Sequence, residues 1–358
     1  MEKYYKNYHI FLFLSTITRG LVSVFSLVIL YQKGYSLSDL FFFLFLLYTF
    51  GLFVNVISLR LNYKFVLVTS SLLYGICYLY LSVMKNTYSS LILFSLLLSI
   101  STYSYHVTRH YLALSILKKE NLKTNQLVCM IYLGTIISSI IGTILISKLP
   151  ILISGILILI LSLISIYPVL TKKIKLKETR RSSIFKIKLS KSKIIFSILE
   201  QFKVIFLEIQ PLFLYLSVKN KIWYVGVFNI ITNLSSLIVA YFFSKRVGRN
   251  NFKYLSLLLA IILFIKLHLK SGIFLLIIAF FEGIGIKIYE NISLENLYEL
   301  GENEIISYLS LEEIIFFLTK SLIIGIAYLF HFNLYLLLSI CIIATLFSGF
   351  FIPEKKAP

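Results

Sequence analysis

A small set of ionisable residues interrupts the long apolar stretches of this 358-residue sequence: Arg19, His106, Arg109, Glu208 and Glu282. An ionisable group at the depth of a bilayer costs at least about 2.5 kcal/mol near its centre on insertion scales. Such groups therefore usually serve transport or pair with a partner. We predict that these five residues line a substrate or proton pathway.

The signs of these groups differ between the two halves of the sequence. Arg19, His106 and Arg109 in the first half are cationic or can become so, whereas Glu208 and Glu282 in the second half are acids. A cavity with one cationic and one anionic wall would suit a zwitterion such as an amino acid or a short peptide. Alternatively, Arg19 neutralises Glu208 or Glu282 across the interface between the halves.

Other acids have a cation at helical spacing, so Glu200 is expected to pair with Lys203, and Glu313 with Lys320. Glu208 and Glu282 have none and need a partner elsewhere, a bound ion or a proton. A carboxylate in a low-dielectric cavity can exchange a proton near neutral pH. We therefore expect proton coupling through one of these two.

Two amides, Asn229 and Asn233, share a predicted helix face with Ser236. They could line the same path or make hydrogen bonds between helices, which is the commoner use of such residues.

The elements that carry these residues are predicted to be transmembrane helices. The chain is 59% hydrophobic and 14% charged, with a mean hydropathy of +0.91, which leaves too little polar surface for a water-soluble globule. Apolar runs of about twenty residues satisfy their backbone hydrogen bonds in lipid as helices. Twelve spans are expected: 10–31, 39–59, 65–83, 89–114, 127–147, 151–170, 194–216, 222–243, 252–269, 273–289, 305–330 and 332–351.

The basic residues between these spans predict the orientation. With the amino terminus inside, the inner segments carry 23 Lys and Arg and the outer joints carry 7. Both termini are therefore expected in the cytoplasm and the chain in the cytoplasmic membrane. Lys266, counted with an outer joint, is expected to reach from the end of its span to the interface.

The longest joint, residues 172–193, holds ten basic residues and one acid. It divides the chain into residues 1–171 and 194–358, each with six spans. Two such bundles that rock around a central cavity are typical of secondary transporters.

Short motifs add to this layout. The segment Gly34-Tyr35-Ser36-Leu37-Ser38-Asp39 leads into the second span, where we expect Asp39 to cap the helix. Two cytoplasmic joints are similar to G-x-x-x-D-R-x-G-R: residues 241–249 keep Arg246, Gly248 and Arg249, and residues 55–64 keep Arg60 and a basic Lys64. On these features the chain resembles the major facilitator superfamily of secondary transporters. The resemblance extends over nearly the whole length of the chain.

The resemblance implies two six-helix bundles, alternating access, and a latch between the bundles formed by these joints. Lys245 and Leu59 replace the signature Asp in the two copies, which removes the carboxylate of that latch. Gly134 and Gly142 resemble a reduced form of a glycine-rich antiporter pattern, but close helix packing explains them better.

The sequence thus predicts a proton-coupled transporter of a small zwitterionic, peptide-like or drug-like solute. The alternative is a non-transporting membrane protein of the same fold, such as a sensor, an assembly factor or an immunity protein. We expect no catalytic activity, no cofactor and no bound metal, because no H-E-x-x-H motif, Cys pair or phosphate loop is present. Expected partners are the solute, protons and anionic inner-leaflet lipids, not nucleic acid, with a monomer favoured.

Overall fold

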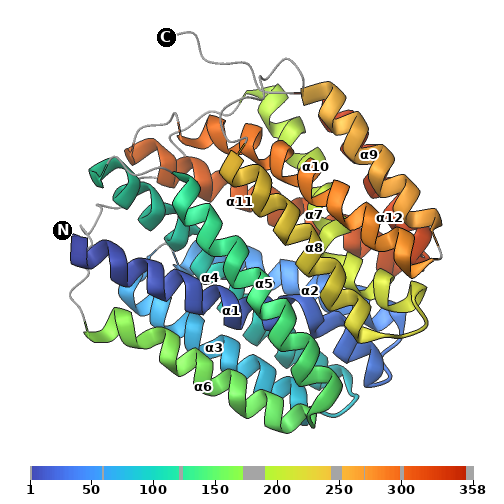
Figure 1. Cartoon of the computed structure of the whole chain (residues 1–358), viewed down its shortest axis with the longest axis horizontal. Coiled ribbons are helices and arrows are strands. Elements are labelled where there is room, and N and C mark those ends of the chain that lie inside the picture. The colour runs from blue at the N-terminus through green and yellow to red at the C-terminus, as the bar shows by residue number, and fades with distance from the viewer. Residues whose placement is uncertain are drawn as a thin grey trace.

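A computed structural model describes residues 2–58, 60–120, 124–171, 190–242, 252–269, 271–298 and 302–351, without the side chains of 2–7, 63, 107–128, 171, 291–298 and 302–310. Within these ranges the chain is helical and has no strand (Figure 1). The helices are α1 (Glu2–Gln32), α2 (Leu37–Ser58), α3 (Tyr63–Val83), α4 (Tyr88–Glu120), α5 (Thr124–Lys148), α6 (Ile151–Thr171), α7 (Lys191–Ser217), α8 (Ile222–Phe242), α9 (Phe252–His268), α10 (Gly272–Tyr298), α11 (Glu302–Leu329) and α12 (Leu334–Ser348).

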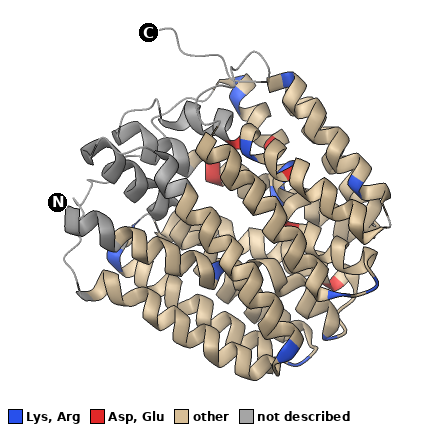
Figure 2. Cartoon of the chain, viewed as in Figure 1, with Lys and Arg blue, Asp and Glu red and all other residues tan. Residues whose placement is uncertain are grey.

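These helices coincide in order with the twelve predicted segments. Seven of them, in the described part of the chain, are long and apolar enough to cross a membrane: α1, α2, α3, α5, α6, α8 and α10. Over most of their length the helices are neither acidic nor basic (Figure 2). Large apolar side chains lie exposed along them, as on α6 at Leu152, Ile156 and Leu163, which is expected of helices that face lipid.

Helices from the same half of the sequence pack on one another. In the first half α3 packs on α6 and α4, and α1 packs on α5 and α6; in the second half α12 packs on α7 and α9, and α10 packs on α8 and α9. The α6 and α9 helices lie on opposite sides of the molecule (Figure 1). Among the described residues, the most extensive contacts between the halves are those of α2 with α11, α5 with α8, α1 with α7, and α4 with α11.

Small residues let neighbouring helices approach closely, both between the halves and within the first half. A methyl group at Gly226 of α8 would lie 1.7 Å from Oγ1 of Thr143 on α5. On the other face of α5, a methyl group at Gly142 would lie 2.4 Å from the ring of Phe25, and one at Gly134 would lie 3.0 Å from Thr16. The packing interpretation of Gly134 and Gly142 is therefore confirmed.

The turn between α1 and α2 depends on a glycine and on a helix cap. Gly34 has a φ of +92°, a conformation in which a side chain would be strained. Ser36 Oγ accepts from the Asp39 backbone N–H, and the Asp39 carboxylate accepts from the Ser36 backbone N–H at 2.9 Å. The N-cap of α2 is therefore Ser36 and not Asp39 as expected; Asp39, three residues later, completes the capping box because its carboxylate reaches back to the Ser36 backbone N–H.

Candidate functional site

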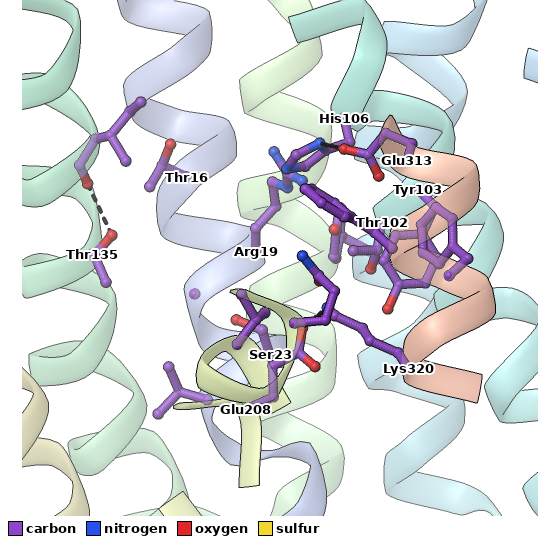
Figure 3. A pocket seen from close by; sticks show the side chains of 18 residues that line it. Thr16, Arg19, Ser23, Thr102, Tyr103, His106, Thr135, Glu208, Glu313 and Lys320 are labelled. Carbon is purple, nitrogen blue, oxygen red and sulfur yellow. Dashed lines mark hydrogen bonds and ion pairs between the residues drawn. The ribbon is translucent and has the colours of Figure 1, made fainter. Parts of the chain in front are cut away.

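A cavity of about 400 Å³ lies between helices of the two halves (Figure 3). Its walls come from α1, α3, α4 and α5 on one side and from α7 and α11 on the other. Among the predicted site residues, Arg19, His106 and Glu208 line it. These three residues therefore share one cavity, and their role in a solute or proton pathway stays a prediction.

Glu208 reaches the cavity from the middle of α7 and has two partners. Lys320 Nζ on α11 lies 2.8 Å from Glu208 Oε1, and the Tyr48 hydroxyl on α2 donates to Glu208 Oε2. The Lys320 side chain is 7% exposed and that of Glu208 is 35% exposed, so the carboxylate faces the open space. Because Tyr48 belongs to the first half, this carboxylate connects the halves.

A second ionisable pair bridges the halves beside the first. His106 Nδ1 on α4 lies 2.7 Å from Glu313 Oε1 on α11. Next to it, the rings of Tyr103 on α4 and Phe317 on α11 meet edge to face at 4.4 Å. The α4–α11 contact is thus part polar and part aromatic.

Arg19 projects from α1 toward the cavity (Figure 3). Its guanidinium carbon lies 3.8 Å from the ring centre of Tyr105 and 5.3 Å from that of Tyr74. In the described part of the chain it makes no ion pair with a carboxylate. The alternative in which Arg19 neutralises Glu208 or Glu282 is therefore not what the structure contains.

Glu282 lies away from the cavity, in the interior of the second half. Its Oε2 accepts from Lys266 Nζ at 2.7 Å, and the same ammonium donates to Gln210 Oε1 at 2.7 Å. The side chains of Lys266 and Glu282 are both fully buried. The prediction that Lys266 reaches the interface is wrong: its side chain extends inward, because Glu282 and the rings of Phe206 and Phe228 offer it a better environment than the end of α9 does.

The two amides of α8 also lie outside the cavity. Asn229 donates to the Val225 carbonyl at 3.0 Å, and Asn233 donates to the Asn229 carbonyl at 2.7 Å. Both bonds are within the helix, so neither predicted role is seen in this conformation. The contact between helices is made instead by Ser236, which donates to the Gly283 carbonyl at 2.8 Å.

The two local pairs predicted from spacing have different outcomes. Lys203 Nζ lies 3.5 Å from Glu200 Oε1, as predicted. The predicted pair of Glu313 with Lys320 is wrong, since Glu313 pairs with His106 and Lys320 pairs with Glu208. Two turns of helix separate Glu313 from Lys320, and partners on neighbouring helices lie nearer.

Sequence reasoning missed Tyr48 and Gln201, which contribute to the site. Tyr48 stands in an aromatic run of α2 where its type gives no signal. Gln201, which lines the cavity from α7, lies two turns before Glu208, and that spacing on one helix face was a usable signal.

Of the predicted latch residues, Arg60 and Lys64 lie exposed at the joint between α2 and α3. There Asn62, which replaces the second signature Gly, caps α3 by accepting from the Lys64 backbone N–H at 2.9 Å. Arg246, Gly248 and Arg249 lie outside the described residues, and so does the side chain of Arg109. Among the described side chains no three metal-ligating groups lie together.

Comparison with known proteins identifies the fold. No protein-family model and no curated protein matches the sequence. A solved structure of the nucleoside transporter NupG, in a variant form, matches with a TM-score of 0.69 and 13% sequence identity over 96% of this chain and 97% of that chain. The chain therefore shares the fold of that protein over nearly its whole length, and its long apolar helices indicate a multi-pass membrane protein.

Proposed function

We propose that this protein is a secondary active transporter that moves a small solute across the cytoplasmic membrane by alternating access. The observation that carries the proposal is the cavity between the halves, whose two acidic side chains each have a partner from the first half: Tyr48 for Glu208, and His106 for Glu313. Pairs of this kind can break and re-form when two bundles rock, because each partner belongs to a different half.

Contacts between the halves at one end of the helices support the proposal that the cavity is closed at that end. Where α1 and α7 end, Gln32 Nε2 donates to the Tyr215 hydroxyl at 3.1 Å, and the rings of Tyr31 and Tyr215 meet at 6.4 Å. Nearby, Phe42 of α2 packs on Tyr328 of α11 at 5.3 Å. Rocking of residues 1–171 against residues 194–358 would separate these contacts and open the cavity there. In the predicted orientation, with both termini in the cytoplasm, this end is extracellular.

Glu208 is the carboxylate we assign to proton coupling. It faces the cavity, whereas Glu282 is fully buried against Lys266 outside it. Protonation of Glu208 would remove its attraction for Lys320 and free that ammonium for the solute or for another partner. A transporter needs such a change of charge to couple a proton gradient to closure of the cavity.

A thermal-shift screen of the purified protein against amino acids, peptides, nucleosides, organic acids and cationic drugs identifies a solute. The flux of that solute is then measured in proteoliposomes with an imposed pH gradient. We expect Glu208→Gln to abolish the stimulation of flux by the gradient. Glu200→Gln is the matched control, since the same change is made two turns away on the same helix, outside the cavity lining. Gradient-driven flux that survives in Glu208→Gln would refute the coupling, and a wild-type protein that moves no solute would refute transport.

A further inference from the structure

The cavity holds one cation whose charge no described carboxylate balances. Lys320 lies against Glu208 and His106 lies against Glu313, each within 2.8 Å. The Arg19 guanidinium lies against the rings of Tyr105 and Tyr74 and within reach of their hydroxyls, and no described carboxylate lies within ion-pair distance of it. A lone guanidinium at the middle of a transmembrane helix is costly, so its retention calls for a counter-charge from outside the chain.

Stacking on aromatic rings prepares Arg19 for such a partner. A ring under the flat face of a guanidinium fixes its plane and leaves the N–H donors in that plane, where a carboxylate binds with two parallel hydrogen bonds. The tyrosine rings are themselves held, since Tyr105 and Tyr74 are both almost fully buried and the Tyr105 hydroxyl lies 3.4 Å from Ser15 Oγ. The plane of the donors is therefore set before a solute arrives.

The opposite side of the cavity is suited to an apolar body. Phe316 and Phe317 of α11 and Tyr103 of α4 line it, and the volume of about 400 Å³ lies in the range of small-molecule sites. By contrast, an ammonium group would find both described carboxylates of the cavity already paired, Glu208 with Lys320 and Glu313 with His106. These contacts favour an anionic solute over the zwitterion expected from the sequence.

We infer that the transported solute is an organic monoanion, whose carboxylate binds Arg19 and whose aromatic or apolar body packs on the rings of Tyr103, Phe316 and Phe317. This inference rests on the proposed function, because it names the substrate class of the same cavity.

A thiol placed beside Arg19 tests the charge of the site without knowledge of the solute. Ser23 lines the cavity one helical turn after Arg19 and is exposed. In a protein with alanine at the three native cysteines, Ser23→Cys is treated with an anionic sulfonatoethyl and a cationic trimethylammonium-ethyl methanethiosulfonate. The rate of modification by each reagent is divided by the rate at which that reagent modifies a free thiol in solution, so that the intrinsic reactivities of the two reagents cancel.

We expect the anionic reagent to react faster, and Arg19→Gln to lower the ratio of the two rates about tenfold, because one unit charge close by is removed. Lys221→Gln is the matched control: it removes one positive charge from an exposed joint outside the cavity and should leave the ratio unchanged. A reactive thiol with no preference for the anion, or with a preference that survives in Arg19→Gln, would overturn the inference alone. A thiol at position 23 that reacts with neither reagent would contradict the proposed function as well.

The body of the solute is tested by protection of the same thiol. We expect 1-naphthoate to slow its modification by a neutral methanethiosulfonate, and Arg19→Lys to weaken that protection while Arg19→Gln removes it. The isosteric 1-naphthamide and 1-naphthylmethylamine should not protect. Equal protection by the amide or the amine, or none by naphthoate, would overturn the assignment of an aromatic carboxylate.

Discussion

At the scale of single residues, the hydroxyl of Tyr48 has a defined task that its neighbours in the sequence do not share. It donates to the Glu208 carboxylate from a fully buried position. A hydrogen bond to a charged group contributes more than one between neutral groups, and the carboxylate keeps only Lys320 when it is lost.

We therefore predict that Tyr48→Phe lowers the free energy of unfolding by about 1.5–3 kcal/mol. Tyr78→Phe is the matched control, because the buried Tyr78 hydroxyl has no hydrogen-bond partner in the described structure. Denaturant unfolding in detergent measures both. Equal losses in the two variants would show that the bond to Glu208 contributes nothing of its own.

The buried pair of Lys266 and Glu282 leads to a larger effect. Removal of one partner leaves a charge without compensation in the interior, so Lys266→Met should destabilise the protein by about 3–5 kcal/mol. Lys266→Met combined with Glu282→Leu should recover most of that loss, because no charge then remains buried. Thermal unfolding followed by size-exclusion chromatography measures this. A double variant no more stable than the single one would mean that packing, not charge, sets the cost.

At the scale of elements, the approach of α5 and α8 depends on the absence of a side chain at Gly226. Gly226→Ala would place a carbon 1.7 Å from Thr143 Oγ1, and the helices would have to move apart. We expect a loss of about 1–3 kcal/mol, typical of overpacking. At Gly285 of α10 the nearest atom to an added carbon is the flexible end of Leu259, at 3.3 Å, so Gly285→Ala is the control. The prediction fails if the two alanines change the melting temperature alike.

What the sequence could predict follows from the range of each interaction. Helix order depends on apolar length, which is local, and the pair of Glu200 with Lys203 depends on spacing within one helix. The partners of Glu208, Glu282 and Glu313 lie on other helices, 112, 16 and 207 residues away in numbering at Lys320, Lys266 and His106. Those contacts depend on the angles at which helices cross and on how deep each residue lies in the bilayer, which the type of a single residue does not predict. The sequence could therefore predict only that these acids need partners on other helices.

At the scale of the whole molecule, alternating access predicts a change of distance between the halves. Lys85, between α3 and α4, and Lys219, between α7 and α8, are exposed at the end where α1 meets α7. Spin labels at these two positions should show one short distance without solute and a second, longer population when solute and pH are varied. Labels at Lys85 and Lys148, both in the first half, should keep a single distance. An unchanged distance in the first pair under all conditions would contradict rocking.

The buried pair between α9 and α10 also bears on how the chain enters the bilayer. The α9 helix, with 17 residues, is not among the helices that are both long and apolar enough to cross by themselves, whereas α10 is. Its ammonium at position 266 meets the carboxylate of the helix that follows immediately in the chain. During synthesis α9 and α10 can therefore enter the bilayer together as a hairpin without net charge at this pair. Insertion of the more favourable α10 then compensates for the cost of inserting α9.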